Sequence, residues 1–129
     1  MIICSIFLYK QLSYIRHNDP GFEKNNILLV PLKTENIYRK HELLKSELLN
    51  ISGIDQITAC YDYPGSGYTS NGYIPEGYEA AILTHVLYTD EDFVPMMGLK
   101  VKAGRNFSKS LETDKSKYLV NETYARFLG

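Results

Sequence analysis

Two short apolar segments that flank an amphipathic helix constrain the fold of this chain more than any other feature. Residues 26–32 (Asn-Ile-Leu-Leu-Val-Pro-Leu) predict a strand that is buried on both faces. Residues 35–51 carry apolar side chains at every third or fourth position, which predicts a helix with Thr34 as N-cap and Gly53 as the left-handed residue after its end. Residues 54–61 predict a second strand. Strand, helix and strand in direct succession predict a βαβ unit whose two strands lie in one sheet.

Shorter elements follow in the second half of the chain. Residues 62–77 are rich in Gly, Pro, Ser, Asn and Tyr, which predicts a long loop or an irregular hairpin with a brief strand at Tyr73 and Ile74. Alternating apolar residues predict a strand over residues 80–88. The remaining expected elements are a short helix that begins at 89–92 and ends at Gly98, strands over 99–103 and 118–120, a polar loop over 107–117, and a helix over 122–128 with Tyr124, Phe127 and Leu128 facing inward. This order predicts an α+β fold with a βαβ-containing mixed sheet and helices on one face.

The first nine residues form an uncharged and almost wholly apolar run. A helix needs about 20 such residues to cross a bilayer, so this run cannot cross alone. It is interpreted as the core of a signal peptide, as a buried first helix of a soluble domain, or as the end of a transmembrane helix. No basic residue precedes it and no small-residue cleavage site follows it, which argues against a signal peptide.

The residues after this run favour the transmembrane interpretation. They form an aromatic and cationic edge of the kind found at lipid headgroups, made by Lys10, Gln11, Tyr14 and Arg16. Asp-Pro-Gly at 19–21 then stops the helix. We therefore expect residues 1–17 to be the end of a transmembrane helix and a stalk, and residues 22–129 to be an extracytoplasmic domain.

Charge and composition exclude several classes of function. The chain has 14 Lys and Arg against 15 Asp and Glu, a formal net charge of -1, so a basic nucleic-acid-binding face is not expected. Cys4 and Cys60 lack metal-binding spacing and are interpreted as free thiols. The three histidines also lack ligand spacing. We expect no metal and no cofactor.

No catalytic residue is predicted either. The acidic residues 90–92 lie at an expected helix start, where capping and interaction with the helix dipole explain them. Ser66 lies between two glycines, as in half of a nucleophile elbow, but Pro64 precedes it and no strand-turn-helix context surrounds it. A small hydrolase that uses Ser66 with a distant His and Asp is therefore the weakest functional hypothesis, and an enzyme is not expected.

Arg105 follows an expected strand and the turn-forming Gly104. Its guanidinium can bind a carboxylate or backbone carbonyl groups through two parallel hydrogen bonds. We hypothesise a clamp between Arg105 and Asp114, or between Arg105 and the backbone, that orders the loop between them.

Several short sequence motifs follow one another in a characteristic order along nearly the whole chain. They include Tyr14 to Phe22 after the apolar run, the apolar segment 26–30, the turn at Pro64 and Gly65, and the later residues Gly98, Gly104, Arg105, Phe107, Asp114, Asn121 and Glu122. Together these phrases resemble the periplasmic core (porter-like) domain of MacB/FtsX-type ABC transporter permeases, especially those of Bacteroidetes. In that family the core domain continues beyond the point matched by Gly129, so the resemblance covers a partial domain.

The resemblance implies an extracytoplasmic domain that is inserted between the first two transmembrane helices of a permease in the bacterial inner membrane and faces the periplasm. ATP-driven motion would reach it from a separate cytoplasmic ATPase subunit through transmembrane helices. It would act on a lipophilic cargo or a periplasmic partner protein and would carry out no covalent chemistry. An uncovered sheet edge or helix face would favour a homodimer. The alternative is a membrane-attached extracytoplasmic domain that senses a ligand.

Overall fold

The computed structural model describes residues 2–17, 21–23 and 25–129. The chain is a small mixed α/β protein with one antiparallel sheet of two strands. Its elements are α1 (Ile2–His17), α2 (Glu35–Arg39), α3 (His41–Leu49), β1 (Thr69–Tyr73), β2 (Ile82–Val86), α4 (Phe93–Met96), the 3-10 helix η1 (Glu112–Ser116) and α5 (Glu122–Leu128).

The sheet is a single hairpin in which β1 pairs with β2. Asn71 lies opposite Thr84, and Tyr73 lies opposite Ile82. Side chains alternate between a half-covered and an exposed face along both strands, as the pleat requires. The loop or irregular hairpin predicted over residues 62–77 is confirmed only in part, because β1 pairs with β2, which lies beyond that range, and only Tyr73 of the predicted strand at Tyr73 and Ile74 belongs to β1. The strand predicted over residues 80–88 is confirmed, although it is shorter than expected.

The predicted βαβ unit and mixed sheet are wrong. Within the described ranges, residues 26–32, 54–61, 99–103 and 118–120 form no strand, and Cys60 makes only an isolated bridge with Thr89. Hairpin strands find each other through a local turn, whereas parallel strands must pair across a long connection. The apolar pattern of the four segments is real, but none of them has a neighbouring strand in this structure.

The predicted helix over residues 35–51 is divided into α2 and α3 at Lys40. The backbone of Lys40 leaves the helical region with φ -107° and ψ 19°. Nδ1 of His41 lies 2.9 Å from the carbonyl oxygen of Tyr38 and hydrogen-bonds to it. Backbone N–H groups at this helix end also donate to the carbonyl oxygens of Ile37 and Tyr38, so the Tyr38 carbonyl accepts from both the backbone and the imidazole. The left-handed conformation predicted for Gly53 is confirmed, with φ +93°.

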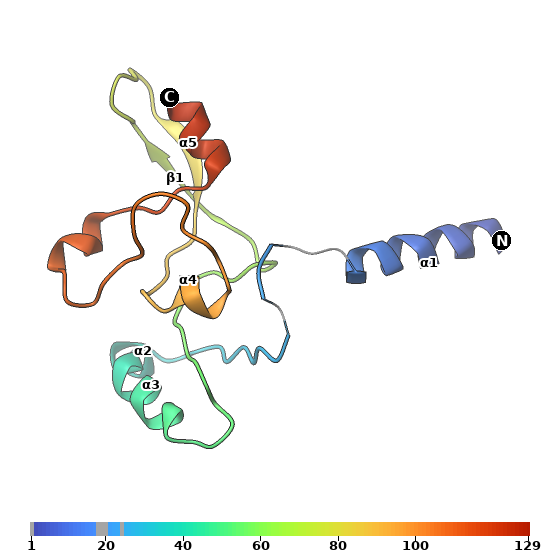
Figure 1. Cartoon of the computed structure of the whole chain (residues 1–129), viewed down its shortest axis with the longest axis horizontal. Coiled ribbons are helices and arrows are strands. Elements are labelled where there is room, and N and C mark those ends of the chain that lie inside the picture. The colour runs from blue at the N-terminus through green and yellow to red at the C-terminus, as the bar shows by residue number, and fades with distance from the viewer. Residues whose placement is uncertain (1, 18–20, 24) are drawn as a thin grey trace.

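Little apolar surface is buried in this chain. Phe93 and Met97, in and just after α4, are the buried hydrophobic residues among those described. The accessible surface is 11290 Å², whereas a compact monomer of 14.8 kDa exposes about 7,000 Å². In Figure 1, α1 projects away from the other elements, and it contacts no other described helix or strand. Much of this surface is therefore of the kind that lipid or another polypeptide covers.

The C-terminal helix α5 begins where the sequence predicts. Asn121 is the N-cap, and its side-chain oxygen accepts a hydrogen bond of 2.8 Å from the backbone N–H of Tyr124. The inward orientation predicted for Phe127 and Leu128 is wrong, because these side chains are 55% and 37% exposed, and the ring of Phe127 stacks on that of Tyr78 at the surface. The Tyr124 hydroxyl lies 3.1 Å from Oγ1 of Thr84, which joins α5 to the hairpin.

Replacing Asn121 with Ala tests this cap. The substitution removes the acceptor at the start of α5 and is expected to destabilise the protein by about 1 kcal/mol. Amide hydrogen exchange should accelerate in residues 123–128. Thr34→Ala is the matched control, because Thr34 is the N-cap of α2 but its side chain makes no cap hydrogen bond. Equal losses of stability in the two variants would contradict the assignment.

Candidate functional site

Helix α1 carries exposed apolar side chains on all of its sides. Ile6, Phe7 and Leu8 are 53%, 61% and 58% exposed. Consecutive residues of an α-helix are about 100° apart, so these three positions alone surround the axis. A helix that is apolar all round is stable when its whole circumference is buried, whereas a helix on a protein surface needs only one apolar stripe. This surface is the most distinctive candidate functional feature of the chain.

No helix in the described ranges is both long enough and apolar enough to span a membrane.

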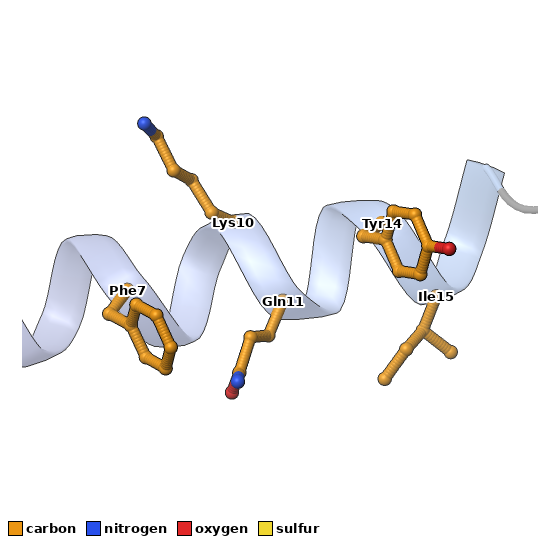
Figure 2. Close-up of a pocket in the computed structure, with 5 residues that line it drawn as sticks. All are labelled: Phe7, Lys10, Gln11, Tyr14 and Ile15. Carbon is orange, nitrogen blue, oxygen red and sulfur yellow. The ribbon is translucent and has the colours of Figure 1, made fainter.

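Figure 2 shows the second half of α1. A shallow, open depression there is lined by Phe7, Lys10, Gln11, Tyr14 and Ile15, all from this one helix. Phe7, Gln11 and Ile15 extend to one side, and Lys10 extends to the opposite side. With no wall from another element, the depression cannot enclose a small ligand. Its combination of aromatic, aliphatic and cationic groups is typical of a helix at the level of lipid headgroups.

A buried cluster of charges holds α3 against the segment before α4. Nζ of Lys45 lies 2.7 Å from Oδ2 of Asp90 and 2.5 Å from Oδ2 of Asp92. Thr58 Oγ1 donates to Asp90 Oδ1, and the backbone N–H of Ala59 donates to Asp90 Oδ2 at 2.9 Å. The Lys45 and Asp90 side chains are each only 10% exposed. This Lys45–Asp90 cluster connects three segments that are far apart in the sequence.

The pKa values in the cluster follow from its contacts. Burial by itself raises the pKa of Asp90, but hydrogen bonds from Lys45, Thr58 and Ala59 outweigh it and leave the pKa below its usual value. Burial lowers the pKa of Lys45, and its two carboxylate partners outweigh that effect and raise it. Both groups therefore stay charged at neutral pH. A carboxylate that is ion-paired and hydrogen-bonded in this way stabilises the structure and is a poor general acid or base.

The interpretation of residues 90–92 as helix caps is only partly correct. Helix α4 begins after Asp92, which occupies the N-cap position without making a side-chain cap bond. Oδ1 of Asp90 does accept a hydrogen bond of 3.2 Å from the backbone N–H of Asp92. The main partner of both carboxylates is Lys45, which lies 45 or more residues away. No metal-binding group of His, Cys, Asp or Glu residues is present in the described part of the chain.

Replacing Lys45 with Met should leave Asp90 charged, partly buried and without its ionic partner. We expect a loss of roughly 3 kcal/mol in the free energy of unfolding. Lys115→Met is the matched control, because Lys115 and its partner Glu112 are 75% and 83% exposed. That variant should change stability by less than about 0.5 kcal/mol. Urea unfolding monitored by circular dichroism compares the two, and similar effects would contradict the importance of the cluster.

The clamp hypothesised between Arg105 and Asp114 is confirmed. Nη1 of Arg105 lies 2.6 Å from Oδ2 of Asp114, and Nη2 lies 2.7 Å from Oδ1. The backbone N–H of Ser108 donates to the same carboxylate at 2.8 Å, and Nη1 also donates to the carbonyl oxygen of Asn106. Asp114 is buried at 8% exposure within η1. The clamp therefore holds Asp114, near the end of the polar loop, against Arg105, which precedes the loop.

The clamp makes stability depend on acidity. The Arg105 guanidinium holds the pKa of Asp114 down at about 2, against an ordinary value of 3.8. The lowered pKa means that the clamp stabilises the fold fully above about pH 4 and that this stabilisation is lost as the pH falls towards 2.

Arg105→Ala should lower the melting temperature by several degrees at pH 7, and the gap from the unmodified chain should shrink between pH 4 and pH 2. Arg126→Ala is the control, because Arg126 is 81% exposed and lies 3.5 Å from its partner Glu122. Thermal unfolding across this pH range is the measurement. If the difference in melting temperature between Arg105→Ala and the unmodified chain stayed constant with pH, the Asp114 carboxylate would not be responsible for it.

The other predicted motif residues have local roles. Gly65, Gly98 and Gly104 adopt left-handed backbone conformations, with φ of +98°, +65° and +80°. Pro64 precedes the first of these glycines in a turn where the N–H of Ser66 donates to the carbonyl of Tyr63. Asn121 caps α5, and Glu122 pairs with Lys102 and Arg126. Among the described contacts within this predicted set, only the pair of Arg105 and Asp114 joins two of its side chains.

Ser66 and the histidines have no catalytic arrangement within the described residues. The Ser66 hydroxyl donates to the carbonyl oxygen of Tyr63 and accepts from its N–H, so it is part of the turn. His85 hydrogen-bonds to Ser70 at 2.9 Å and lies against the ring of Tyr68 on the hairpin surface. No carboxylate contacts the His85 ring in this part of the chain. The side chain of His17 lies outside the described residues.

A cluster of tyrosines was not predicted from the sequence. The side chain of Asn71 donates to the hydroxyl of Tyr88 at 2.6 Å, and the rings of Tyr73 and Tyr118 meet edge to face at 5.5 Å. Hydrogen bonds with the side chains of Asn71, Tyr88 and Tyr118 lower the pKa of Tyr73. The same bonds raise the pKa of the two partner tyrosines. The cluster places the ring of Tyr118 against the hairpin. In the sequence, this cluster is indicated only by the many tyrosines around the hairpin.

Comparisons with protein-family profiles, with curated proteins and with solved structures find no match to this chain. The likeness to permease domains therefore stays a prediction. Function has to be inferred from the chain's own residues, and the most distinctive of these are the surface of α1 and the two ion-paired clusters.

Proposed function

We propose that this chain is a non-catalytic extracytoplasmic domain of an ABC transporter permease of the MacB/FtsX type. It lies on the periplasmic side of the bacterial inner membrane and transmits ATP-driven conformational change to a cargo or a partner protein. The observation that supports this best is α1, which projects from the body and exposes apolar side chains around its whole circumference. Lipid is the environment that suits such a helix.

The dimensions of α1 fit the end of a membrane-inserted helix. Its 16 residues span about 24 Å. Residues 2–9, before the first charge at Lys10, span about 12 Å, close to half of the hydrocarbon thickness of about 30 Å. Lys10, Gln11 and Tyr14 would then lie among the headgroups. In this arrangement the body is held outside the bilayer, and movement of the helix moves the body.

The ion-paired clusters support a mechanical role for the body. A domain that transmits movement must resist being pulled apart, and this chain buries little apolar surface to provide that resistance. The Lys45–Asp90 cluster joins α3 to the segment before α4, and the Arg105–Asp114 clamp closes the loop that precedes α5. These charged groups are engaged in structural contacts, which favours transmission over chemistry. A cytoplasmic ATPase would act on the body through transmembrane helices.

Purification from the membranes of the cells that encode the chain tests this function. We expect the tagged chain to be in the membrane fraction and to copurify with an ABC ATPase subunit, identified by mass spectrometry. Ile6→Lys with Leu8→Lys should release the chain into the soluble fraction without the ATPase, because each charge costs about 3 kcal/mol within hydrocarbon. Leu83→Lys is the control: Leu83 lies in β2, is 72% exposed, and its replacement should change neither result.

The remaining outcomes separate the alternatives. A chain that stays in the membrane fraction without any ATPase would contradict the permease proposal and favour the membrane-attached sensing domain. A wild-type chain in the soluble fraction would contradict both, because α1 would then be covered by protein.

A further inference from the structure

The segment that follows α1 is attached to the C-terminal end of α4. The backbone N–H of Glu23 donates a hydrogen bond of 2.9 Å to the carbonyl oxygen of Met97. The two segments also approach closely at Gly98, where an added Cβ would lie 3.0 Å from Cγ of Glu23 and 3.9 Å from its Cβ. Phe22, just before Glu23, is partly buried. We call residues 21–23 the strap.

The end of α4 leaves a carbonyl group for the strap. The N–H groups of Gly98 and Leu99 fold back onto carbonyl oxygens of α4 in a Schellman motif, with Gly98 in the left-handed conformation at φ +65°. Such a motif does not satisfy the carbonyl of the C-cap residue, which is Met97. The N–H of Glu23 supplies a donor for it, so the strap completes the end of the helix.

The residues just before α4 carry contacts that hold the body together. Asp90 and Asp92 bind Lys45 of α3, and the side chain of Asn106 donates a hydrogen bond of 2.7 Å to the carbonyl oxygen of Glu91. The two buried hydrophobic side chains of the described residues also belong to α4 and its C-cap. The strap therefore meets the body at the segment to which α3 and the loop after Arg105 are both attached.

We propose that the strap is a reversible coupling between α1 and the body. Held at Met97 and Gly98, it makes α1 and residues 90–98 move as one unit, and when it detaches they move independently. Helix α1 contacts no other described helix or strand, so its position depends on the chain that follows it. Detachment exchanges one backbone hydrogen bond for bonds to water, which makes it reversible. The source of the movement rests on the proposed function, whereas the attachment itself does not.

Gly98→Ala tests the attachment. The added methyl group crowds Cγ of Glu23 and should displace the strap from Met97. We expect the protection of the residue-23 amide against hydrogen exchange, measured by NMR on the full chain in detergent, to fall about tenfold. Gly77→Ala is the matched control for left-handed strain, because Gly77 has φ +84° and no described atom lies within 4 Å of an added Cβ. Protection at residue 23 should not change in that variant.

The double variant Gly98→Ala with Glu23→Ala separates crowding from strain. It removes Cγ of Glu23 and leaves its Cβ at 3.9 Å, which is an ordinary contact. Protection at residue 23 should then match that of Glu23→Ala alone within about twofold. The proposal is overturned if Gly98→Ala leaves this protection unchanged, or if the double variant is as poorly protected as Gly98→Ala.

A distance measurement tests the coupling. In the full chain with Cys4→Ser and Cys60→Ser, nitroxide labels on Tyr14→Cys in α1 and Leu43→Cys in α3 report how the helix lies relative to the body, since both positions are exposed. We expect a single narrow distance distribution by electron paramagnetic resonance, which is lost when Gly98→Ala is added and kept in the strain control. A distribution that is broad from the start, or unaffected by Gly98→Ala, would overturn the coupling.

These measurements use the purified chain, so they are independent of its membrane fractionation and of any ATPase. A chain that stays soluble without an ATPase but shows the narrow, strap-dependent distance would contradict the permease proposal and leave the coupling intact. A chain that copurifies with an ATPase but lacks this distance would contradict the coupling and leave the permease proposal intact.

Discussion

The buried contact between Lys45 and Asp90 is the constraint on which the body of this protein depends. The two side chains are 10% exposed and lie 2.7 Å apart, and Asp90 also receives hydrogen bonds from Thr58 and from the N–H of Ala59. These bonds fix α3, residues 58–60 and the start of α4 relative to one another. A chain with a larger apolar core would position such segments by packing. In this protein the buried carboxylate of Asp90 needs specific ionic and hydrogen-bond partners, and these partners determine how the three segments are arranged.

This dependence on polar contacts explains why so much apolar surface is left uncovered. Ion pairs and capping bonds have directions, so they can hold loops without enclosing a core. The same chain has apolar residues on α1 and in the segment 27–32 that are highly exposed. The two surfaces differ in kind, because α1 is a helix with apolar side chains on all sides, whereas residues 27–32 form an irregular segment whose backbone groups pair with no other described backbone group.

Local signals in the sequence predicted their structures well, and long-range partners could not be predicted. Asn121, Gly53 and Gly98 act within a few residues, and the Arg105–Asp114 clamp spans only nine. The Lys45–Asp90 cluster joins positions 45 residues apart, and nothing in either local pattern identifies the other member. The strands predicted over residues 26–32, 54–61, 99–103 and 118–120 failed for the same reason: a strand is defined by its neighbour, and apolar alternation describes only one side of that pair. The break between α2 and α3 at Lys40 was missed as well, because the apolar pattern continues across it; His41, just after the break, hydrogen-bonds to the Tyr38 carbonyl.

The position of Cys60 has a chemical consequence for the whole chain. Its thiol is half-buried, and burial together with the nearby charges of Asp90 and Asp62 raises its pKa. The thiolate is the form that attacks disulfides and oxidants, so this sulfur is chemically quiet at neutral pH. Cys4, by contrast, is exposed on α1. Under oxidising conditions the thiol of the body should therefore react slowly for as long as the charges around it stay in place.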